Sequence, residues 1–268
     1  QCFFARALDC TKGILYVVLV AWTTTICAAY IGEKEDARMK IAGLQKLTLL
    51  DYPGKVACSM FTPGCNYRCP FCHNAALVLP ERPRGEIHGG DVLAFLRKRV
   101  GMLDGVCVSG GEPLLQAGLT DFLREVKALG YAVKLDTNGS NPALLGLLID
   151  EGLLDYAAMD IKNNLSKYCE TAGVPGLDLD TVVQSAELLM QERIPFEFRT
   201  TLVREFHTRE DVLEIGRWLQ GAPRYFLQHF VDSGDLLSGG LHPVEEDEMR
   251  VMADILRSYV NEVELRGI

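Results

Sequence analysis

Short apolar segments alternate along the chain with longer segments in which apolar residues recur every three or four positions. The short segments have the length and continuous hydrophobicity of buried strands, and the longer ones have the spacing of amphipathic helices. The predicted strands are residues 55–62, 105–110, 131–139, 153–162, 194–203 and 224–230. The predicted helices are residues 91–103, 119–130, 141–152, 179–192, 210–220 and 244–259, the last of which closes the chain. Six strand–helix repeats predict an α/β fold with a parallel sheet covered by helices.

Polar residues follow the end of every predicted strand. In parallel α/β folds the ligand binds at the carboxyl ends of the strands, so these residues are expected to converge on one rim. In strand order they are Cys65–Cys72, Ser109–Pro113, Asp136–Gly139, Met159–Lys162, Arg199–Thr201 and Gln228–Phe230. The pattern therefore predicts a single site built from six strand ends.

The first 38 residues differ from the rest of the chain. They contain an uncharged apolar run, residues 13–31, whose 19 residues are just long enough to cross a bilayer. Three interpretations are open: a membrane anchor or signal, an apolar helix packed on the domain, and an extension that is not part of the natural product. Because the charged residues 33–38 separate the run from Met39, we favour the third interpretation and expect one domain over residues 39–268.

Charge and cysteine content narrow the class of protein. The net charge is −9 and no lysine- or arginine-rich run is present, which argues against a nucleic acid as the main partner. The nine cysteines are an odd number and are unevenly spread, with three of them crowded into one short segment. This distribution does not resemble a disulfide framework. It predicts a reduced, cytoplasmic protein with one metal or redox site.

The crowded cysteines are Cys65, Cys69 and Cys72, in the segment FTPGCNYRCPFCHNAAL. Together with His73 they form a potential zinc site, although two adjacent side chains rarely bind one small ion well. Residues 69–73, CPFCH, also match the c-type haem pattern, which requires export and usually a small helical fold. The third alternative is a four-iron cluster held by three thiolates, which leaves one iron open for a small molecule.

The spacing Cys-x₃-Cys-x₂-Cys with Phe71 just before the last cysteine resembles the radical S-adenosylmethionine (SAM) superfamily. The resemblance covers nearly all of residues 40–230. It implies a partial, laterally open (β/α)₆ barrel of parallel strands and a [4Fe–4S] cluster on the three cysteines. It also implies that the amino and carboxylate groups of SAM chelate the open iron.

The GGEP segment, Gly110 to Pro113, resembles the motif that follows the second strand in this family. By this resemblance, the backbone of Gly110 and Gly111 and the carboxylate of Glu112 hold the methionine amino group. Glycines allow close approach of the main chain, and a carboxylate suits an ammonium. Standing alone, the same four residues would indicate an ordinary turn.

The segments DTNG and MDIK, which follow the third and fourth strands, resemble those of glycyl radical activating enzymes. The resemblance implies that Asp160 binds the ribose hydroxyls and that Lys162 binds the methionine carboxylate. Asp136 lies beside the same carboxylate, through a cation or a water. Arg199 on the fifth strand is expected to order the site, and its alternative role is an ordinary ion pair.

The adenine contacts are assigned in the same way. Phe71 meets the adenine through its backbone, and His229 or Phe230 flanks it from the sixth strand, with a register uncertain by one residue. The remaining histidines have only surface-loop interpretations: His88, His207 and His242.

The segment CNYRCPFCHN resembles the glycyl radical activating branch, and residues 43–66 resemble the longer type of anaerobic ribonucleoside-triphosphate reductase-activating protein. The short activators of that reductase differ, because they carry tyrosine in place of His73. In the implied reaction, flavodoxin or ferredoxin reduces the cluster and SAM is cleaved to methionine and a 5′-deoxyadenosyl radical. That radical takes a hydrogen from a glycine of the partner enzyme, so no side chain need act as acid or base.

Three alternatives share part of this pattern. Activation of another glycyl radical enzyme, of the pyruvate formate-lyase type, would use the same motifs. A radical SAM enzyme acting on a small molecule would also share the cofactor motifs. An iron–sulfur or haem electron-transfer protein would need a fourth ligand and would not need the GGEP and MDIK segments.

Overall fold

The computed structural model describes residues 39–79, 86–232 and 234–268 of the chain. The predictions for residues 1–38, including the apolar run 13–31, lie outside the described residues. Within the described ranges, no helix is both long enough and apolar enough to span a membrane.

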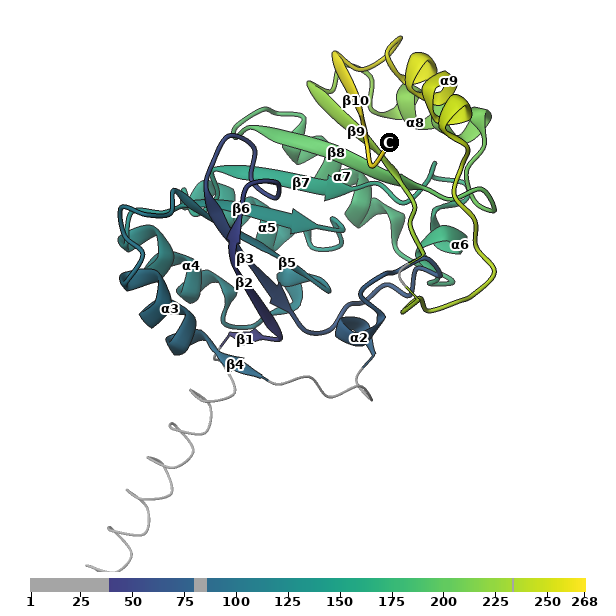
Figure 1. Cartoon of the computed structure of the whole chain (residues 1–268). Coiled ribbons are helices and arrows are strands. Elements are labelled where there is room, and N and C mark those ends of the chain that lie inside the picture. Colours follow the sequence, from purple (N-terminus) through teal and green to yellow (C-terminus); the bar gives the residue numbers. More distant parts are fainter. Residues whose placement is uncertain (1–38, 80–85, 233) are drawn as a thin grey trace, which may run out of the picture. The chain divides into compact units, whose positions relative to one another are not determined.

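The centre of the domain is a sheet of eight strands, in the order β10-β9-β8-β7-β6-β5-β3-β2 (Figure 1). All neighbours are parallel except β2, which runs antiparallel to β3. The strands are β2 (Gly43–Thr48), β3 (Ala57–Thr62), β5 (Gly105–Gly110), β6 (Ala132–Thr137), β7 (Tyr156–Asp160), β8 (Phe196–Leu202), β9 (Arg224–His229) and β10 (Glu262–Arg266). A separate antiparallel pair joins β1 (Lys40–Ile41) to β4 (Ile87–His88).

Helices connect the parallel strands, and α5 and α7 lie behind the sheet in the view of Figure 1. The helices are α2 (Ala75–Val78), α3 (Gly89–Arg97), the 3₁₀ turn η1 (Pro113–Leu115), α4 (Leu119–Ala128), α5 (Pro142–Asp150), α6 (Tyr168–Ala172), α7 (Leu179–Leu189), α8 (Arg209–Trp218) and α9 (Glu246–Leu256). The six predicted strands and six predicted helices are therefore all present, with ends shifted by a few residues.

Local sequence signals explain several of these boundaries. Asn141 caps α5, with its side chain accepting the Leu144 N–H at 3.1 Å, and Pro142 occupies the first turn, where no N–H is needed. At the start of α8, Thr208 and Asp211 form a reciprocal capping box.

The two faces of the central strands differ in chemistry because successive side chains point to opposite sides. In β8, Phe196 and Phe198 belong to the apolar core, whereas Arg199 lines a cavity on the other side. In β6, Val133 is a core residue and Asp136 faces the cavity. The alternation thus anchors each strand while leaving its polar face for a site.

The structure differs from the prediction at both edges of the sheet. The last helix does not close the chain, because β10 follows it and pairs in parallel with β9. Its sequence, EVELR, alternates apolar and charged residues and lacks the continuous apolar run of the central strands. The antiparallel β2 was missed for the same reason. Within the described ranges, β2 and β10 each have one sheet neighbour, so the sheet is open at the side, which confirms the open α/β architecture.

Candidate active site

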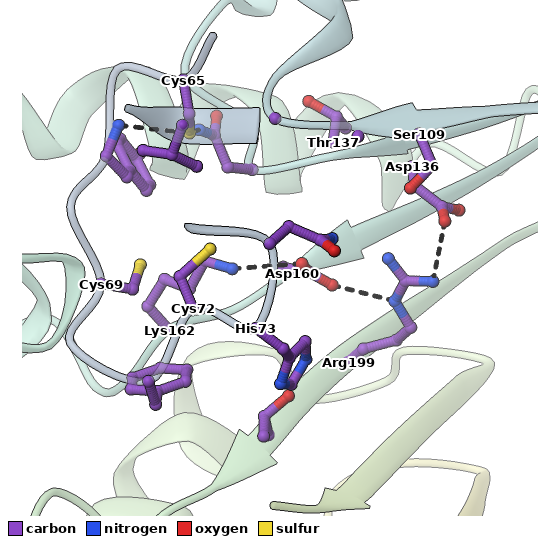
Figure 2. A pocket seen from close by; sticks show the side chains of 18 of the residues that line it. Cys65, Cys69, Cys72, His73, Ser109, Asp136, Thr137, Asp160, Lys162 and Arg199 are labelled. Atoms are coloured by element: carbon purple, nitrogen blue, oxygen red, sulfur yellow. Dashed lines mark hydrogen bonds and ion pairs between the residues drawn. The ribbon is translucent and has the colours of Figure 1, made fainter. Parts of the chain in front are cut away.

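A cavity of about 240 Å³ lies at the carboxyl ends of the parallel strands (Figure 2). One wall is the cysteine loop, residues 63–74, which follows β3. The other wall consists of polar side chains from the ends of five strands, β5 to β9. Those side chains are Ser109, Asp136, Asp160, Arg199, Thr201 and Gln228, together with Lys162 just beyond β7. The predicted convergence of strand ends is thus present.

The cysteine loop brings Cys65, Cys69 and Cys72 to the same cavity. Its backbone is fixed from outside the loop, with the Gly64 N–H donating to the Leu77 carbonyl at 2.7 Å and the Arg68 N–H to the Ala172 carbonyl at 2.9 Å. Burial raises the pKa of the Cys65 thiol to about 11, and burial also raises the pKa values of the other two. Metal binding must therefore displace thiol protons.

The two glycines of the GGEP segment hold this loop in place. The Gly111 N–H donates to the Thr62 carbonyl at 2.9 Å. A Cβ on Gly111 would lie 1.8 Å from the Gly64 carbonyl oxygen, and one on Gly110, whose φ is +124°, would lie 2.2 Å from the Thr62 nitrogen. Glycine is therefore needed at both positions because the end of β5 lies directly against the backbone of Thr62, at the end of β3, and of Gly64 just beyond it.

Glu112 lies behind the lining of the cavity, and its predicted contact with the methionine amino group stays a prediction. Its side chain is fully buried and is absent from the cavity wall. The carboxylate accepts hydrogen bonds from Leu114 N–H at 3.0 Å, Thr137 Oγ1 at 2.8 Å and Asn138 N–H at 2.7 Å. Burial raises the pKa of Glu112 to about 7. Through these bonds Glu112 ties the end of β5 to the end of β6.

Five charges alternate along the opposite wall and directly behind it, and we call them the charged wall: Lys134, Asp136, Arg199, Asp160 and Lys162. Four of them line the cavity, and Lys134 is buried behind Asp136. Arg199 joins two strands, with Nη1 3.3 Å from Asp136 Oδ2 and Nε 2.9 Å from Asp160 Oδ1. Lys162 Nζ lies 3.1 Å from Asp160 Oδ2, and Lys134 pairs with Asp136 (Figure 2 shows the Arg199 and Lys162 pairs). With three cations and two carboxylates, the charged wall has an excess of one positive charge.

These pairs determine the ionisation of the charged wall. Burial alone would raise the pKa values of Asp136 and Asp160, but Arg199 and the neighbouring lysines outweigh it and lower both. Burial likewise works to lower the pKa of Lys162, yet Asp160 and nearby cysteines raise it. Asp136, Asp160 and Lys162 are therefore charged at neutral pH.

His207 corrects a second prediction. It was expected in a surface loop, but it is buried, and its Nδ1 accepts the Val203 N–H at 3.1 Å. Its Nε2 therefore carries the proton and donates to the Lys162 carbonyl at 2.8 Å. Burial lowers the pKa of His207, in keeping with a neutral ring. The ring also lies against Phe71, with centroids 6.4 Å apart, so it braces both Lys162 and the cysteine loop. The other two histidines of the surface group, His88 and His242, are exposed as expected.

The end of β9 contributes one residue to the cavity. Gln228 lines the cavity, whereas His229 and Phe230 do not. Phe230 is fully buried, and His229 lies against the C-terminal Gly267. The adenine contact predicted for His229 or Phe230 stays a prediction, and Gln228 is the residue of this strand that lines the cavity.

Sequence reasoning missed Lys134, which is 2% exposed within β6. The signal was present: a lysine inside an apolar strand must be paired, and Asp136 is the next residue on the same face. It also missed the contacts of Asn138 with the cysteine loop: its Nδ2 lies 3.8 Å from Cys65 Sγ and donates to Asn66 Oδ1 at 2.9 Å. Nothing in the local sequence indicated that contact, because it joins two loops far apart in the chain.

The arrangement of the three thiols differs from that of a single-ion site. Within the described ranges, no three His, Cys, Asp or Glu side chains are grouped so that they could hold one metal ion. A four-iron cluster makes a different demand, since each cysteine binds a different iron atom. The open arrangement of the three thiols around one cavity suits such a cluster.

The chain is similar in sequence to proteins of known family. The sequence model of the radical SAM superfamily matches residues 59–219. A Methanocaldococcus jannaschii protein that is named a glycyl-radical enzyme activating enzyme is 32% identical over 238 residues, which cover 85% of this chain and 96% of the relative. A pyruvate formate-lyase-activating enzyme of Staphylococcus epidermidis is 27% identical over 188 residues, which cover 66% of this chain and 73% of the relative.

Among solved structures, SuiB of Streptococcus suis bound to its precursor peptide SuiA superposes with a TM-score of 0.60 at 16% identity. The match covers 76% of this chain and 47% of that chain. At this identity the likeness concerns the fold alone.

Proposed function

The chain belongs to the radical SAM superfamily, and from this membership we propose that it activates a glycyl radical enzyme by forming the radical on that partner. The observation that carries the proposal is the meeting of three cysteine thiols with an alternating wall of charges in one cavity. The substrate class is supported by the relative that covers 85% of this chain.

Enzymes of this superfamily use a [4Fe–4S] cluster and SAM, and the residues of the cavity fit both. Cys65, Cys69 and Cys72 would hold the cluster. When bound and reduced, the cluster and SAM together supply a carbon-centred radical capable of abstracting hydrogen. The excess positive charge of the charged wall suits a ligand that carries a carboxylate.

The chain's own residues would bind and orient SAM. Lys162 has three N–H donors, one of which bonds Asp160, so it would also hold the methionine carboxylate. Asp160 is fixed by two cations and would present its oxygens to the ribose. The backbone beside Gly110 and Gly111 would hold the amino group, and the backbone of Phe71 the adenine. Asp136, paired at both oxygens, would keep Arg199 in place.

We assign the partner as an anaerobic ribonucleoside-triphosphate reductase, on the resemblance of residues 43–66 to the longer activating proteins. A second candidate, pyruvate formate-lyase, is favoured by the similarity to its activating enzyme in Staphylococcus epidermidis. The electron donor would be flavodoxin or ferredoxin. Because an open iron is destroyed by oxygen, we place the protein in anaerobic cytoplasm.

The test is a direct assay of radical transfer. The full chain is reconstituted anaerobically with iron and sulfide, reduced with dithionite and mixed with SAM and each purified partner candidate. We expect 5′-deoxyadenosine and, with the correct partner, the EPR doublet of a glycyl radical. SAM cleavage without a radical on either partner would contradict the assigned partners, and no SAM cleavage at all would contradict the enzyme class. Cys69→Ala serves as the inactive control.

A further inference from the structure

The hydroxyl of Tyr67 is buried without a hydrogen-bond partner. Tyr67 lies in the cysteine loop between Cys65 and Cys69, is 2% exposed and lines the cavity. Within the described ranges, only its hydroxyl and Ser140 Oγ are buried side-chain polar atoms without a partner. A buried hydroxyl of this kind costs about 1–3 kcal/mol unless something accepts its proton.

Other buried tyrosines show how unusual this is. Tyr131 donates to the Leu96 carbonyl at 2.7 Å, and Tyr156 donates to Glu197 at 2.8 Å. The Tyr225 hydroxyl lies 2.6 Å from Thr200 Oγ1. The chain therefore satisfies its tyrosine hydroxyls elsewhere, and the exception lies at the cavity where a ligand is expected.

The surroundings of Tyr67 indicate the kind of acceptor. Its own backbone N–H points to Cys65 Sγ at 3.3 Å. Its side chain is close enough to Lys162, Glu112, Cys69 and Cys65 to interact electrostatically with each of them. The Glu112 carboxylate is already occupied by three protein donors. Lys162 is a cation and accepts no hydrogen bond. The acceptors that a cluster would bring to this place are its negatively charged sulfurs.

We propose that the Tyr67 hydroxyl donates a hydrogen bond to a sulfur of the iron–sulfur cluster and thereby raises the cluster's reduction potential. Hydrogen bonds to the sulfurs are one of the means by which proteins set these potentials. The reduced cluster carries one more negative charge, so it accepts the bond more strongly than the oxidised cluster does. The inference rests on the proposed cysteine ligands and is independent of which partner is activated.

The experiment compares Tyr67→Phe with Tyr131→Phe, a matched removal of a satisfied hydroxyl far from the loop. In the metal-free full chain, Tyr67→Phe should be at least as stable to denaturant as the wild type, because no partner is lost. Tyr131→Phe should be less stable, because the Leu96 carbonyl loses its donor. A Tyr67→Phe loss equal to that of Tyr131→Phe would overturn the proposal, since it would show a partner within the protein.

The reconstituted proteins are then titrated by EPR at controlled potential without SAM. At the potential where half of the wild-type cluster is reduced, Tyr67→Phe should show a reduced-to-oxidised ratio about three- to tenfold lower, where tenfold corresponds to about 59 mV for one electron. Tyr131→Phe should match the wild type. An unchanged midpoint potential for Tyr67→Phe would overturn the proposal. If the midpoint were unchanged and SAM binding were weaker, the hydroxyl would be assigned to SAM instead of the cluster. If instead Cys69→Ala still assembled the cluster, the proposed ligand set itself would be wrong.

Discussion

The two walls of the cavity are built in opposite ways. On the charged wall, each carboxylate is already paired with two cations, so its geometry is fixed by the protein alone. On the cysteine loop, the thiols have at most weak partners: Cys65 Sγ receives the Tyr67 N–H at 3.3 Å and Asn138 Nδ2 at 3.8 Å. The charged wall is therefore preorganised to bind a ligand, whereas the cysteine loop needs a bound ligand to complete its contacts.

The largest effect should come from removing a thiol of the cysteine loop. Cys69→Ala should abolish cluster assembly, and with it SAM cleavage, because the proposed cluster needs all three thiols of the loop as ligands. The measurement is iron and sulfide content followed by quantification of 5′-deoxyadenosine. Cys169→Ala, which removes a half-buried thiol outside the cavity, is the matched control and should retain both. Equal cluster content in Cys69→Ala and Cys169→Ala would show that the cysteine loop does not hold the cluster, and would contradict the contrast between the two walls.

The junction between the walls should be the next most sensitive place. Gly111→Ala would force a methyl group against the Gly64 carbonyl and should cost on the order of 3 kcal/mol or more, as overpacking against backbone cannot be relieved by a side-chain rotation. Gly90→Ala in α3 has open space around it and should stabilise by up to about 1 kcal/mol. Denaturant unfolding of both variants measures the difference. A mild effect of Gly111→Ala would show that the loop is not held by this contact.

The preorganised wall can be tested through its central cation. Arg199→Met leaves Asp136 and Asp160 with one lysine each and should cost about 2–3 kcal/mol, because a buried carboxylate loses a partner. It should also weaken SAM binding, measured by calorimetry on the reconstituted enzyme. Arg204→Met breaks an exposed pair with Glu205 and should change stability by less than about 1 kcal/mol. If the two substitutions behaved alike, the charged wall would not be a preorganised unit.

The smallest effect concerns Glu112, beneath the cavity. Because burial raises its pKa to about 7, the folded protein binds a proton that the unfolded chain has already released above about pH 4.5. The contribution of Glu112 to stability therefore falls as the pH rises from 5 to 8. Glu112→Gln should lie within about 1 kcal/mol of the wild type at pH 5, where both side chains are neutral and each presents a donor to the same partners. It should gain stability relative to the wild type at pH 8, because only the wild type loses stability over this range. A gap that stays constant between these pH values would contradict the assigned pKa.

The sequence was most informative where a polar residue follows a buried strand. Asp136, Asp160 and Arg199 each continue a period-two pattern, and parallel strands necessarily bring such positions to one edge. The central strands and the open α/β sheet could be predicted for the same reason. The edge strands β2 and β10 could not, because strands with one sheet neighbour tolerate charged residues and lose the continuous apolar signal.

Other features depend on contacts between segments far apart in the chain. The direction of Glu112 is set by donors in the loop after β6, and the burial of His207 is set by the backbone of Lys162, 45 residues earlier. Whether Gln228 or His229 faces the cavity depends on a one-residue register. Tertiary contacts of this kind leave no local pattern, so the sequence alone did not predict the surroundings of Glu112 or the cavity position of Gln228, and it placed His207 incorrectly.

The central claim, that the cysteine loop becomes a functional wall only with a SAM-binding cluster, can be tested most directly by EPR. The reconstituted, dithionite-reduced full chain is measured with and without SAM. We expect about four iron atoms per chain and a reduced-cluster signal whose shape changes when SAM is added. A signal that is indifferent to SAM, or a protein that holds zinc or haem at Cys65, Cys69 and Cys72, would contradict it.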